Sequence, residues 1–310
     1  MKVWIADAMD AGVKRLLADA GLEVAEQSGL AGDALGAALD GSQGLLVRGA
    51  TRVTRDVVTR ARDLKAVARA GSGVDNIDLE ACRERGVAVF NTPGANAVSV
   101  AEHTWALILA LHRHLPRAAA SMAAGRWEKN DLGGREVRGK LLGLVGFGRV
   151  GQEVARIGLA FGCRVQAHDP LVFIEDVVPG AAAATLDVLL ATSDIVSLHA
   201  PLLPETKGLL SAERLARMKP GALLVNCARG ALIDEAALER ALAEGRLAGA
   251  GLDVFEREPP GDRPLLRLPQ VLATPHVAAS TPEAQLRAGI EAAAAIRDYL
   301  ATGQAPGRVA

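Results

Sequence analysis

The chain has 310 residues, of which 50% are hydrophobic and only 3% aromatic, and its formal net charge at pH 7 is −1. This length allows two domains of ordinary size, and the near-neutral charge gives no indication of a nucleic-acid partner. Three widely spaced cysteines argue against a disulfide framework or a zinc cluster and favour a cytoplasmic protein. The apolar segment 97–120 is interrupted by charged residues and histidines, so we expect no membrane span. No cluster of residues has the spacing of metal ligands, so we expect no metal site.

Short apolar runs alternate with helical segments through the first ninety residues, with strands expected at 3–6, 22–25, 44–48, 66–69 and 87–91. Repeated strand–helix units predict a parallel sheet with helices on both faces. A loop signal, Asn-Thr-Pro-Gly, follows the fifth strand at residues 91–94. We therefore place a domain boundary there.

One helix is expected over residues 97–120, followed by a polar segment, 121–138, that contains Trp127. Two readings of this region stay open: a crossover that forms a dimer contact, or an internal core helix. The strand–helix alternation resumes after residue 140, and a last helix at 281–300 is expected to return to the first domain. The predicted fold class is thus α/β with two doubly wound parallel sheets. A Rossmann domain, residues 97–279, is inserted in a flavodoxin-like substrate domain, residues 1–96 and 280–310.

A glycine motif in residues 140–169 dominates the second domain. Gly146, Gly148 and Gly151 have the spacing G-x-G-x-x-G between an apolar strand and an amphipathic helix, and a second strand ends at Asp169. The glycines permit a tight turn and a close approach of the backbone to a pyrophosphate at the helix N-terminus. A carboxylate at Asp169 binds ribose hydroxyls and repels a 2′-phosphate. The motif therefore predicts NAD as the cofactor.

Three polar residues follow expected strands of the same domain: Arg229 after VNCA, Glu258 in VFEREPP and His276 in TPHVAAS. These residue types suit the oxidation of a 2-hydroxy acid. An arginine binds the substrate carboxylate in a bidentate manner, and a histidine takes the hydroxyl proton as hydride leaves. A neighbouring glutamate orients the imidazole and favours its protonated form.

The strand ends of the first domain carry Arg48 and the turn Arg69-Ala70-Gly71-Ser72-Gly73. Ligands in open α/β sheets bind beyond the carboxyl ends of the strands, and the N–H groups of a Gly-Ser-Gly turn form a nest for a carboxylate. An ordinary turn capped by Ser72 is an equally good reading of that segment.

Six segments carry a resemblance to a known family: ARAGSGVDNIDLEACRERGVAVFNTPGAN, LVGFGRVG, HAPLLPETKGLL, VNCARGALIDE, AGLDVFEREPP and TPHVAASTPEAQ. In these segments the chain resembles the D-2-hydroxyacid dehydrogenases, most closely the phosphoglycerate dehydrogenase branch. The resemblance implies that Arg229, Glu258 and His276 are catalytic. It implies NAD contacts from Ser72, Gly146, Gly148, Arg149, Val150, Gly151, Asp169, Ala200, Pro201, Cys227, Ala228, Arg229, Asp253, His276, Val277, Ala278 and Ala279. It implies substrate contacts from Arg48, Arg69, Ser72, Gly73, Arg229 and His276.

The family resemblance further implies a homodimer formed through the cofactor domain and a small 2-hydroxy or 2-oxo acid as substrate. Our first functional hypothesis is NAD-dependent oxidation of D-3-phosphoglycerate to 3-phosphohydroxypyruvate, the first step of serine biosynthesis. A reductase of hydroxypyruvate, glyoxylate or another 2-oxo acid is the alternative within the family. A binding protein that senses NAD(H) is the alternative from another class.

Overall fold

The computed structural model describes residues 1–310. They divide into two compact units, one of residues 1–96 with 279–310 and one of residues 97–278. Each unit is built on a single sheet in which all strands are parallel. The predicted fold class, α/β with two parallel sheets, is confirmed.

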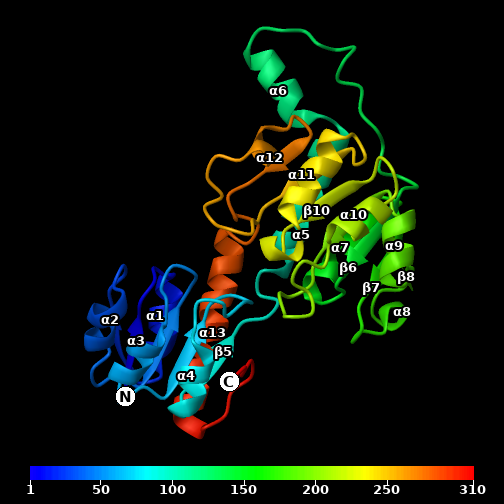
Figure 1. The fold of residues 1–310 in the computed structure, drawn as a ribbon. Coiled ribbons are helices and arrows are strands. Elements are labelled where there is room, and N and C mark those ends of the chain that lie inside the picture. Colours follow the sequence, from blue (N-terminus) through cyan, green and yellow to red (C-terminus); the bar gives the residue numbers. More distant parts are fainter. The chain divides into compact units, whose positions relative to one another are not determined.

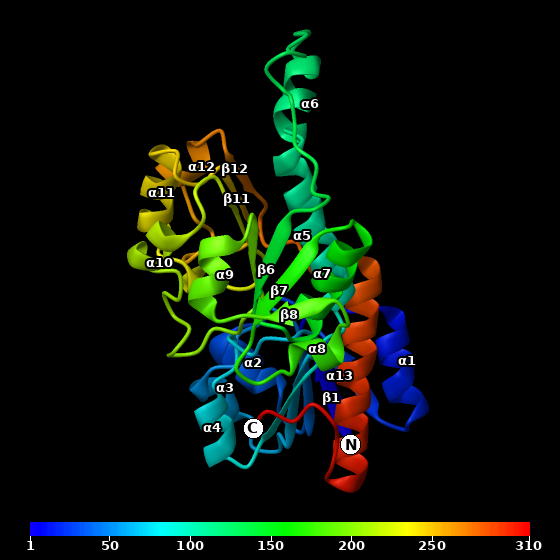
Figure 2. The ribbon, with the colours of Figure 1, turned by 90° about the vertical axis from the view of Figure 1, so that its right-hand side faces the viewer.

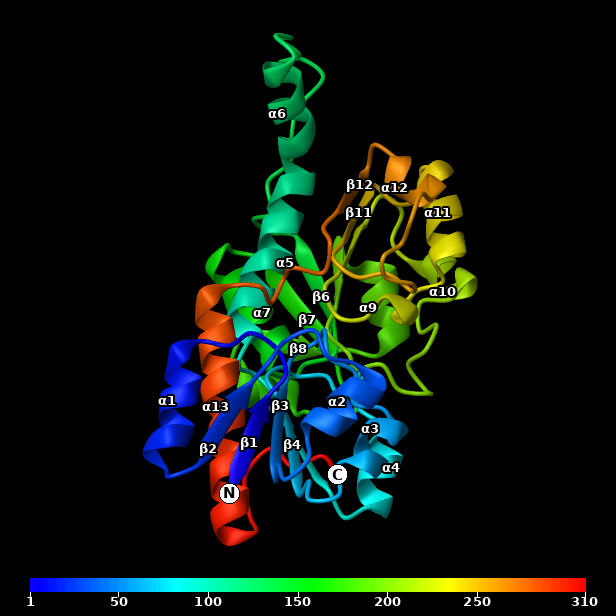
Figure 3. The ribbon, with the colours of Figure 1, turned by 90° about the vertical axis from the view of Figure 1, so that its left-hand side faces the viewer.

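The first unit contains a five-stranded sheet in the order β2-β1-β3-β4-β5, which is the order of flavodoxin-like folds. Its strands are β1 (Lys2–Ile5), β2 (Glu23–Glu26), β3 (Gly44–Val47), β4 (Ala66–Arg69) and β5 (Ala88–Asn91). Helices α1 (Ala11–Asp19) and α13 (Pro282–Thr302) cover one face of the sheet (Figure 3). Helices α2 (Gly32–Ala38), α3 (Arg55–Arg60) and α4 (Leu79–Glu84) cover the other face.

The buried side chains of these strands alternate between two apolar layers. Leu46 belongs to the layer with α1 and α13, whereas its neighbours Leu45 and Val47 belong to the layer with α2, α3 and α4. This alternation is the period of a β-strand buried on both faces. It explains why the strands read in the sequence as continuous apolar runs.

The second unit contains a seven-stranded sheet in the order β12-β11-β10-β9-β6-β7-β8. Its strands are β6 (Leu141–Val145), β7 (Arg164–His168), β8 (Ala181–Ala183), β9 (Ile195–Leu198), β10 (Leu223–Asn226), β11 (Gly249–Leu252) and β12 (Val271–Ala273). The chain proceeds from β6 to one edge through β7 and β8, then returns to β9 on the other side of β6. The strand order therefore reverses between β6 and β9, and ligands of such sheets bind at this switch point.

Helices α5 (Ala97–His112) and α7 (Arg149–Ala160) pack against each other on one face of this sheet (Figure 2). The opposite face is covered by α9 (Leu186–Thr192), α10 (Ala212–Arg217) and α11 (Glu235–Ala243). Shorter pieces are α8 (Ile174–Val177), the 3₁₀ turn η1 (Gly230–Leu232) and α12 (Pro264–Arg267). None of the helices combines the length and apolarity needed to cross a membrane.

The expected single helix over 97–120 is wrong. Helix α5 ends at His112, His114 adopts a left-handed conformation with φ 51°, and a separate helix α6 covers Leu115–Ala123. Pro116 explains the break, because proline has no N–H to donate to the His112 carbonyl. The backbone N–H of Arg135 occupies that carbonyl instead, at 2.8 Å. Helix α6 and the segment after it extend away from the seven-stranded sheet (Figure 1).

The other differences from the expected elements are small. The alanine run at 181–183, which is not among the expected strands, is the edge strand β8 and pairs with β7. Helices α8 and α12 are too short to produce a periodic pattern. The five strands of the first unit and the last helix, α13, agree with the expected ranges to within two residues at either end.

Candidate active site

The glycine turn lies at the switch point of the second unit. Gly146 directly follows β6 with φ 91°, and a Cβ there would lie 2.6 Å from the backbone of His199 and Ala200 after β9. A Cβ at Gly151 would lie 2.5 Å from the Gly146 carbonyl oxygen. Both positions therefore require glycine, because a side chain at Gly146 would collide with the turn after β9 and one at Gly151 would push helix α7 away from the glycine turn.

Gly148 differs from the other two glycines of the motif. A Cβ at this residue would meet nothing within 4 Å, and Gly148 is the N-cap of the 12-residue helix α7. The space in front of the helix N-terminus is thus open, with N–H groups of the first turn available to an anion. Arg149 and Val150 form that first turn. This arrangement fits the pyrophosphate of a dinucleotide.

Asp169 follows β7, next to the glycine turn. One of its carboxylate oxygens accepts the Phe147 N–H at 2.7 Å, and the other accepts the Leu171 N–H at 2.9 Å. The two bonds fix the carboxylate, and its remaining lone pairs suit ribose hydroxyls. The fixed negative charge would repel a 2′-phosphate. The Asp169 carboxylate therefore fits NAD better than NADP.

The other candidate cofactor contacts of the second unit follow the ends of neighbouring strands. Ala200 and Pro201 come after β9, Cys227 and Ala228 after β10, and Val277 and Ala278 after β12. Burial raises the pKa of the Cys227 thiol to about 12. The thiol is therefore neutral at pH 7 and serves as a small apolar surface. Ala279 belongs to the first unit.

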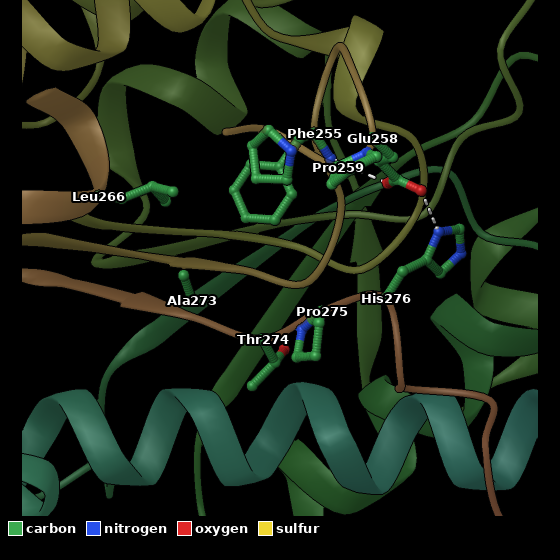
Figure 4. Close-up of a pocket in the computed structure, with 9 residues that line it drawn as sticks. Phe255, Glu258, Pro259, Leu266, Ala273, Thr274, Pro275 and His276 are labelled. Atoms are coloured by element: carbon green, nitrogen blue, oxygen red, sulfur yellow. Dashed lines mark hydrogen bonds and ion pairs between the residues drawn. The ribbon is translucent and has the colours of Figure 1, made fainter. Parts of the chain in front are cut away.

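Glu258 and His276 form a direct pair at this edge of the sheet (Figure 4). The His276 Nδ1 lies 2.7 Å from Glu258 Oε2, and Glu258 Oε1 accepts the Phe255 N–H at 3.1 Å. The two side chains are 48% and 38% exposed, so solvent or a ligand reaches them. Because Nδ1 is engaged by Glu258, Nε2 is the ring nitrogen left to exchange a proton with a ligand.

A cavity of about 530 Å³ adjoins this pair. Its walls are mostly apolar and include Phe255, Pro259, Pro260, Leu266 and Pro275. Glu258, Thr274 and His276 supply its polar atoms. The carboxylate and the imidazole therefore lie beside apolar surface, where their mutual attraction is stronger than in water.

The loop that carries His276 is held by Asp253, which is fully buried after β11. The Asp253 carbonyl accepts the His276 N–H at 2.8 Å. Its carboxylate accepts the Val277 and Ala278 N–H groups, each at 2.9 Å, and the Thr274 hydroxyl at 2.5 Å. His276 itself has φ 54°, a left-handed conformation that is costly for a residue with a side chain. Asp253 thus stabilises the strained backbone of His276.

Arg229 is placed by the fully buried Asn226 at the end of β10. The Asn226 amide group donates to the Arg229 carbonyl at 2.9 Å and accepts the Ala228 N–H at 3.0 Å. The guanidinium donates to the Ala228 carbonyl at 2.7 Å. Arg229 thus follows a rigid turn on the strand next to β11, at the edge that bears the glycine turn and His276.

Four candidate residues belong to the first unit: Arg48 follows β3, Arg69 is the last residue of β4, and Ser72 and Gly73 follow β4. The Arg48 backbone N–H is bound by the buried Asp7 carboxylate, which also accepts the Thr51 hydroxyl at 2.8 Å. The Arg69 guanidinium donates to the carbonyls of Arg48 and Gly73. Arg69 therefore braces the two loops, a structural role that the sequence did not indicate.

The hydroxyl of Ser72 lies 3.0 Å from Asn96 Oδ1, and the Ser72 carbonyl accepts from the Asn91 side chain at 2.7 Å. The helix that follows this turn, α4, is capped by the Asp78 side chain.

Some residues of this site gave no recognisable signal in the sequence. His103 on α5 places its Nε2 3.0 Å from the Thr274 hydroxyl and 3.5 Å from Asp253. Glu235, the first residue of α11, contacts the loop that carries Glu258. Both contacts join segments more than twenty residues apart, so no local pattern reveals them.

Residues 105–278 match the family model described as "D-isomer specific 2-hydroxyacid dehydrogenase, NAD binding domain". A D-3-phosphoglycerate dehydrogenase of Rattus norvegicus is 45% identical over 300 residues, which are 96% of this chain and 56% of the relative. A hydroxypyruvate reductase of Thermotoga maritima is 50% identical over 250 residues, which are 80% of this chain and 81% of the relative.

The solved structure of the TT0316 protein from Thermus thermophilus superposes with a TM-score of 0.89 at 40% identity, and the match covers 100% of both chains. The chain spans only about half the length of the phosphoglycerate dehydrogenases that it matches, as the 56% coverage of the rat relative shows.

Proposed function

Because the chain belongs to the D-isomer specific 2-hydroxyacid dehydrogenase family, we propose that it interconverts a D-2-hydroxy acid and the corresponding 2-oxo acid with NAD. The observation that carries this proposal is the Glu258–His276 pair, 2.7 Å apart, at the sheet edge that also bears the open glycine turn. Proton exchange and dinucleotide binding are the two requirements of this reaction class.

In this proposal His276 Nε2 takes the proton of the substrate hydroxyl during oxidation and returns it during reduction. Glu258 holds Nδ1 and stabilises the positive charge that the ring acquires. Arg229 binds the substrate carboxylate. Bound NAD supplies the hydride acceptor for oxidation or, once reduced, the hydride donor. The glycine turn, Asp169 and the strand-end residues after β9, β10 and β12 hold the cofactor.

For the substrate we propose D-3-phosphoglycerate, oxidised to 3-phosphohydroxypyruvate as the first step of serine biosynthesis. Several relatives of this name match about 95% of the chain at about 45% identity. We assign Arg48 to the substrate phosphate, since Asp7 fixes its backbone at a strand end. The hydroxypyruvate reductase of similar identity supports the second candidate, reduction of an unphosphorylated 2-oxo acid.

We also propose a homodimer formed through the second unit. Helix α6 and the segment after it carry Leu115, Met122 and Trp127, which are 53%, 57% and 77% exposed. Large apolar side chains gathered on a projecting segment mark an interaction surface. The three cysteines are free and buried, which supports the cytoplasmic location that we propose.

The experiment is NADH oxidation measured in parallel with 3-phosphohydroxypyruvate, hydroxypyruvate, glyoxylate and pyruvate. A kcat/KM at least about tenfold higher for the phosphorylated acid, equivalent to about 1.4 kcal/mol, is the expected result. The variant Arg48→Ala should then raise KM for that acid far more than for glyoxylate. Preference for an unphosphorylated acid would establish the reductase instead. NADH binding with no turnover of any acid would refute an enzyme and favour an NAD(H) sensor.

A further inference from the structure

The loop between β11 and α12, residues 253–263, carries Glu258. It is held by the ion pair between Glu235 and Arg263. Glu235 is only 8% exposed, and its carboxylate accepts from the Arg263 guanidinium and from the Glu256 N–H. The Arg263 Nε donates to the Pro260 carbonyl at 3.0 Å. The pair thus contacts this loop at residues 256, 260 and 263, on both sides of Glu258.

The same loop lies directly on the turn that carries Arg229. A Cβ at Gly230 would lie 1.8 Å from the carbonyl carbon of Phe255 and 2.3 Å from the Glu256 nitrogen. The backbone at 255–256 is therefore fixed between Gly230 on one side and the Glu235 carboxylate on the other. This fixed backbone in turn contacts Glu258, because the Phe255 N–H donates to Glu258 Oε1.

Side-chain packing alone does not restrain the loop on all sides. Phe255, Pro259 and Pro260 border the cavity of about 530 Å³ beside the Glu258–His276 pair (Figure 4). On that side the loop faces the cavity. Opposite the cavity the loop is held by polar contacts, chief among them the ion pair between Glu235 and Arg263, whose side chains are 9% and 30% exposed.

We propose that Glu235 and Arg263 are positioning residues, which hold the loop so that Glu258 meets His276 Nδ1. The inference rests on the proposed function, since it acts through the pair to which we assign proton transfer. Neither side chain is needed for contact with substrate or cofactor in this role. Their effect should therefore fall on kcat and leave cofactor binding unchanged.

The test is a double-mutant cycle with Glu235→Gln and Glu258→Gln, assayed by NADH oxidation with the best 2-oxo acid. The amide of Glu235→Gln keeps an acceptor for the Glu256 N–H but loses the ion pair. We expect it to lower kcat about tenfold, with KM and the Kd for NADH within about twofold of wild type. In the Glu258→Gln background it should lower kcat no further, because the two residues act in series.

The neighbouring pair Arg267–Asp262 provides a matched control. It joins α12 to the same loop, but its side chains are 70% and 73% exposed. Arg267 bonds to Asp262 and takes no part in the contacts that Glu235 and Arg263 make with residues 256 and 260. Arg267→Gln should leave kcat unchanged. Arg263→Lys keeps the charge and should recover part of the activity that Arg263→Gln loses. Equal losses in both backgrounds of the cycle, or an unchanged kcat in Glu235→Gln, would overturn the inference.

A readout independent of turnover separates this inference from the proposed function. In ¹⁵N-histidine spectra, the Nδ1 signal of His276, assigned with His276→Gln, reports its bond to Glu258. Glu235→Gln should move that signal toward its position in Glu258→Gln, even if no 2-oxo acid is turned over. A His276 signal that Glu235→Gln leaves in place contradicts the positioning role.

Discussion

Asp253 offers the sharpest perturbation of the site, because one side chain holds the whole loop that bears His276. The change Asp253→Asn preserves size but replaces a carboxylate oxygen with an NH₂ group. Every group that faces the carboxylate from this loop is a donor: the Val277 and Ala278 N–H groups and the Thr274 hydroxyl. In either orientation of the asparagine, a donor therefore faces a donor.

The magnitude follows from those bonds. A hydrogen bond to a charged acceptor contributes about 1.5–3 kcal/mol, and a buried donor left unpaired costs about 1–3 kcal/mol. The left-handed backbone of His276, φ 54°, adds about 1–3 kcal/mol of strain that the loop can release by moving. The loop will therefore relax once the loss of hydrogen bonds to Asp253 equals this strain energy of about 1–3 kcal/mol. We expect kcat to fall about 100-fold, equivalent to about 2.7 kcal/mol.

Steady-state NADH oxidation and NADH binding by fluorescence measure the two possible effects separately. Thr274→Ser keeps the hydroxyl that Asp253 accepts and is the control that should stay close to wild type. A kcat within threefold of wild type for Asp253→Asn would refute the reasoning. A weaker affinity for NADH with unchanged kcat would instead indicate a direct contact of Asp253 with the cofactor, the role that the family resemblance implies.

Three further predictions concern the cofactor, pH and assembly. Asp169→Ser removes the charge that repels a 2′-phosphate, so kcat/KM with NADPH should rise about tenfold relative to NADH in the same assay. Burial of the ring lowers the pKa of His199 to about 3, against 6.5 for the unburied group. The unfolded chain therefore binds the proton first, and stability is lost as pH falls below about 6.5. This loss reaches about 2 kcal/mol at pH 5. His199→Asn should remove the His199 contribution to the difference between the urea midpoints at pH 7 and pH 5. A variant with the wild-type difference would contradict this assignment. Trp127→Ala should shift the protein toward monomer in sedimentation equilibrium, because the indole is 77% exposed on the segment that we assign to the dimer contact, and an unchanged dimer would contradict that assignment.

Much of the fold follows from local patterns in the sequence. Strands such as β6 and β9 are apolar runs bounded by glycine or polar residues. The resemblance to the D-2-hydroxyacid dehydrogenases, confirmed by the family model, rests on motifs at strand ends. Two of those motifs contain Glu258 and His276, whose side chains meet in the structure.

The errors and omissions have physical reasons. Strand β8 consists of three alanines, which favour helix by propensity and form a strand here only by pairing with β7. Pro116 is a sequence signal for the break after α5. The prediction of one helix over 97–120 followed the apolar pattern and gave this proline too little weight. The roles of His103, Glu235 and Arg263 depend on contacts between distant segments. No spacing rule predicts such contacts, because the sheet order determines them.

In the proposed reaction, His276, held by Glu258, transfers the proton while NAD accepts or donates the hydride of a 2-hydroxy or 2-oxo acid. The most direct measurement is the single-turnover oxidation of bound NADH by 3-phosphohydroxypyruvate, with wild type and His276→Gln compared side by side. A positioned general acid contributes about 10²–10⁴-fold. We predict a rate at least about 100-fold lower for His276→Gln, with the affinity for NADH unchanged within about twofold. A variant that turns over within threefold of wild type would contradict the account.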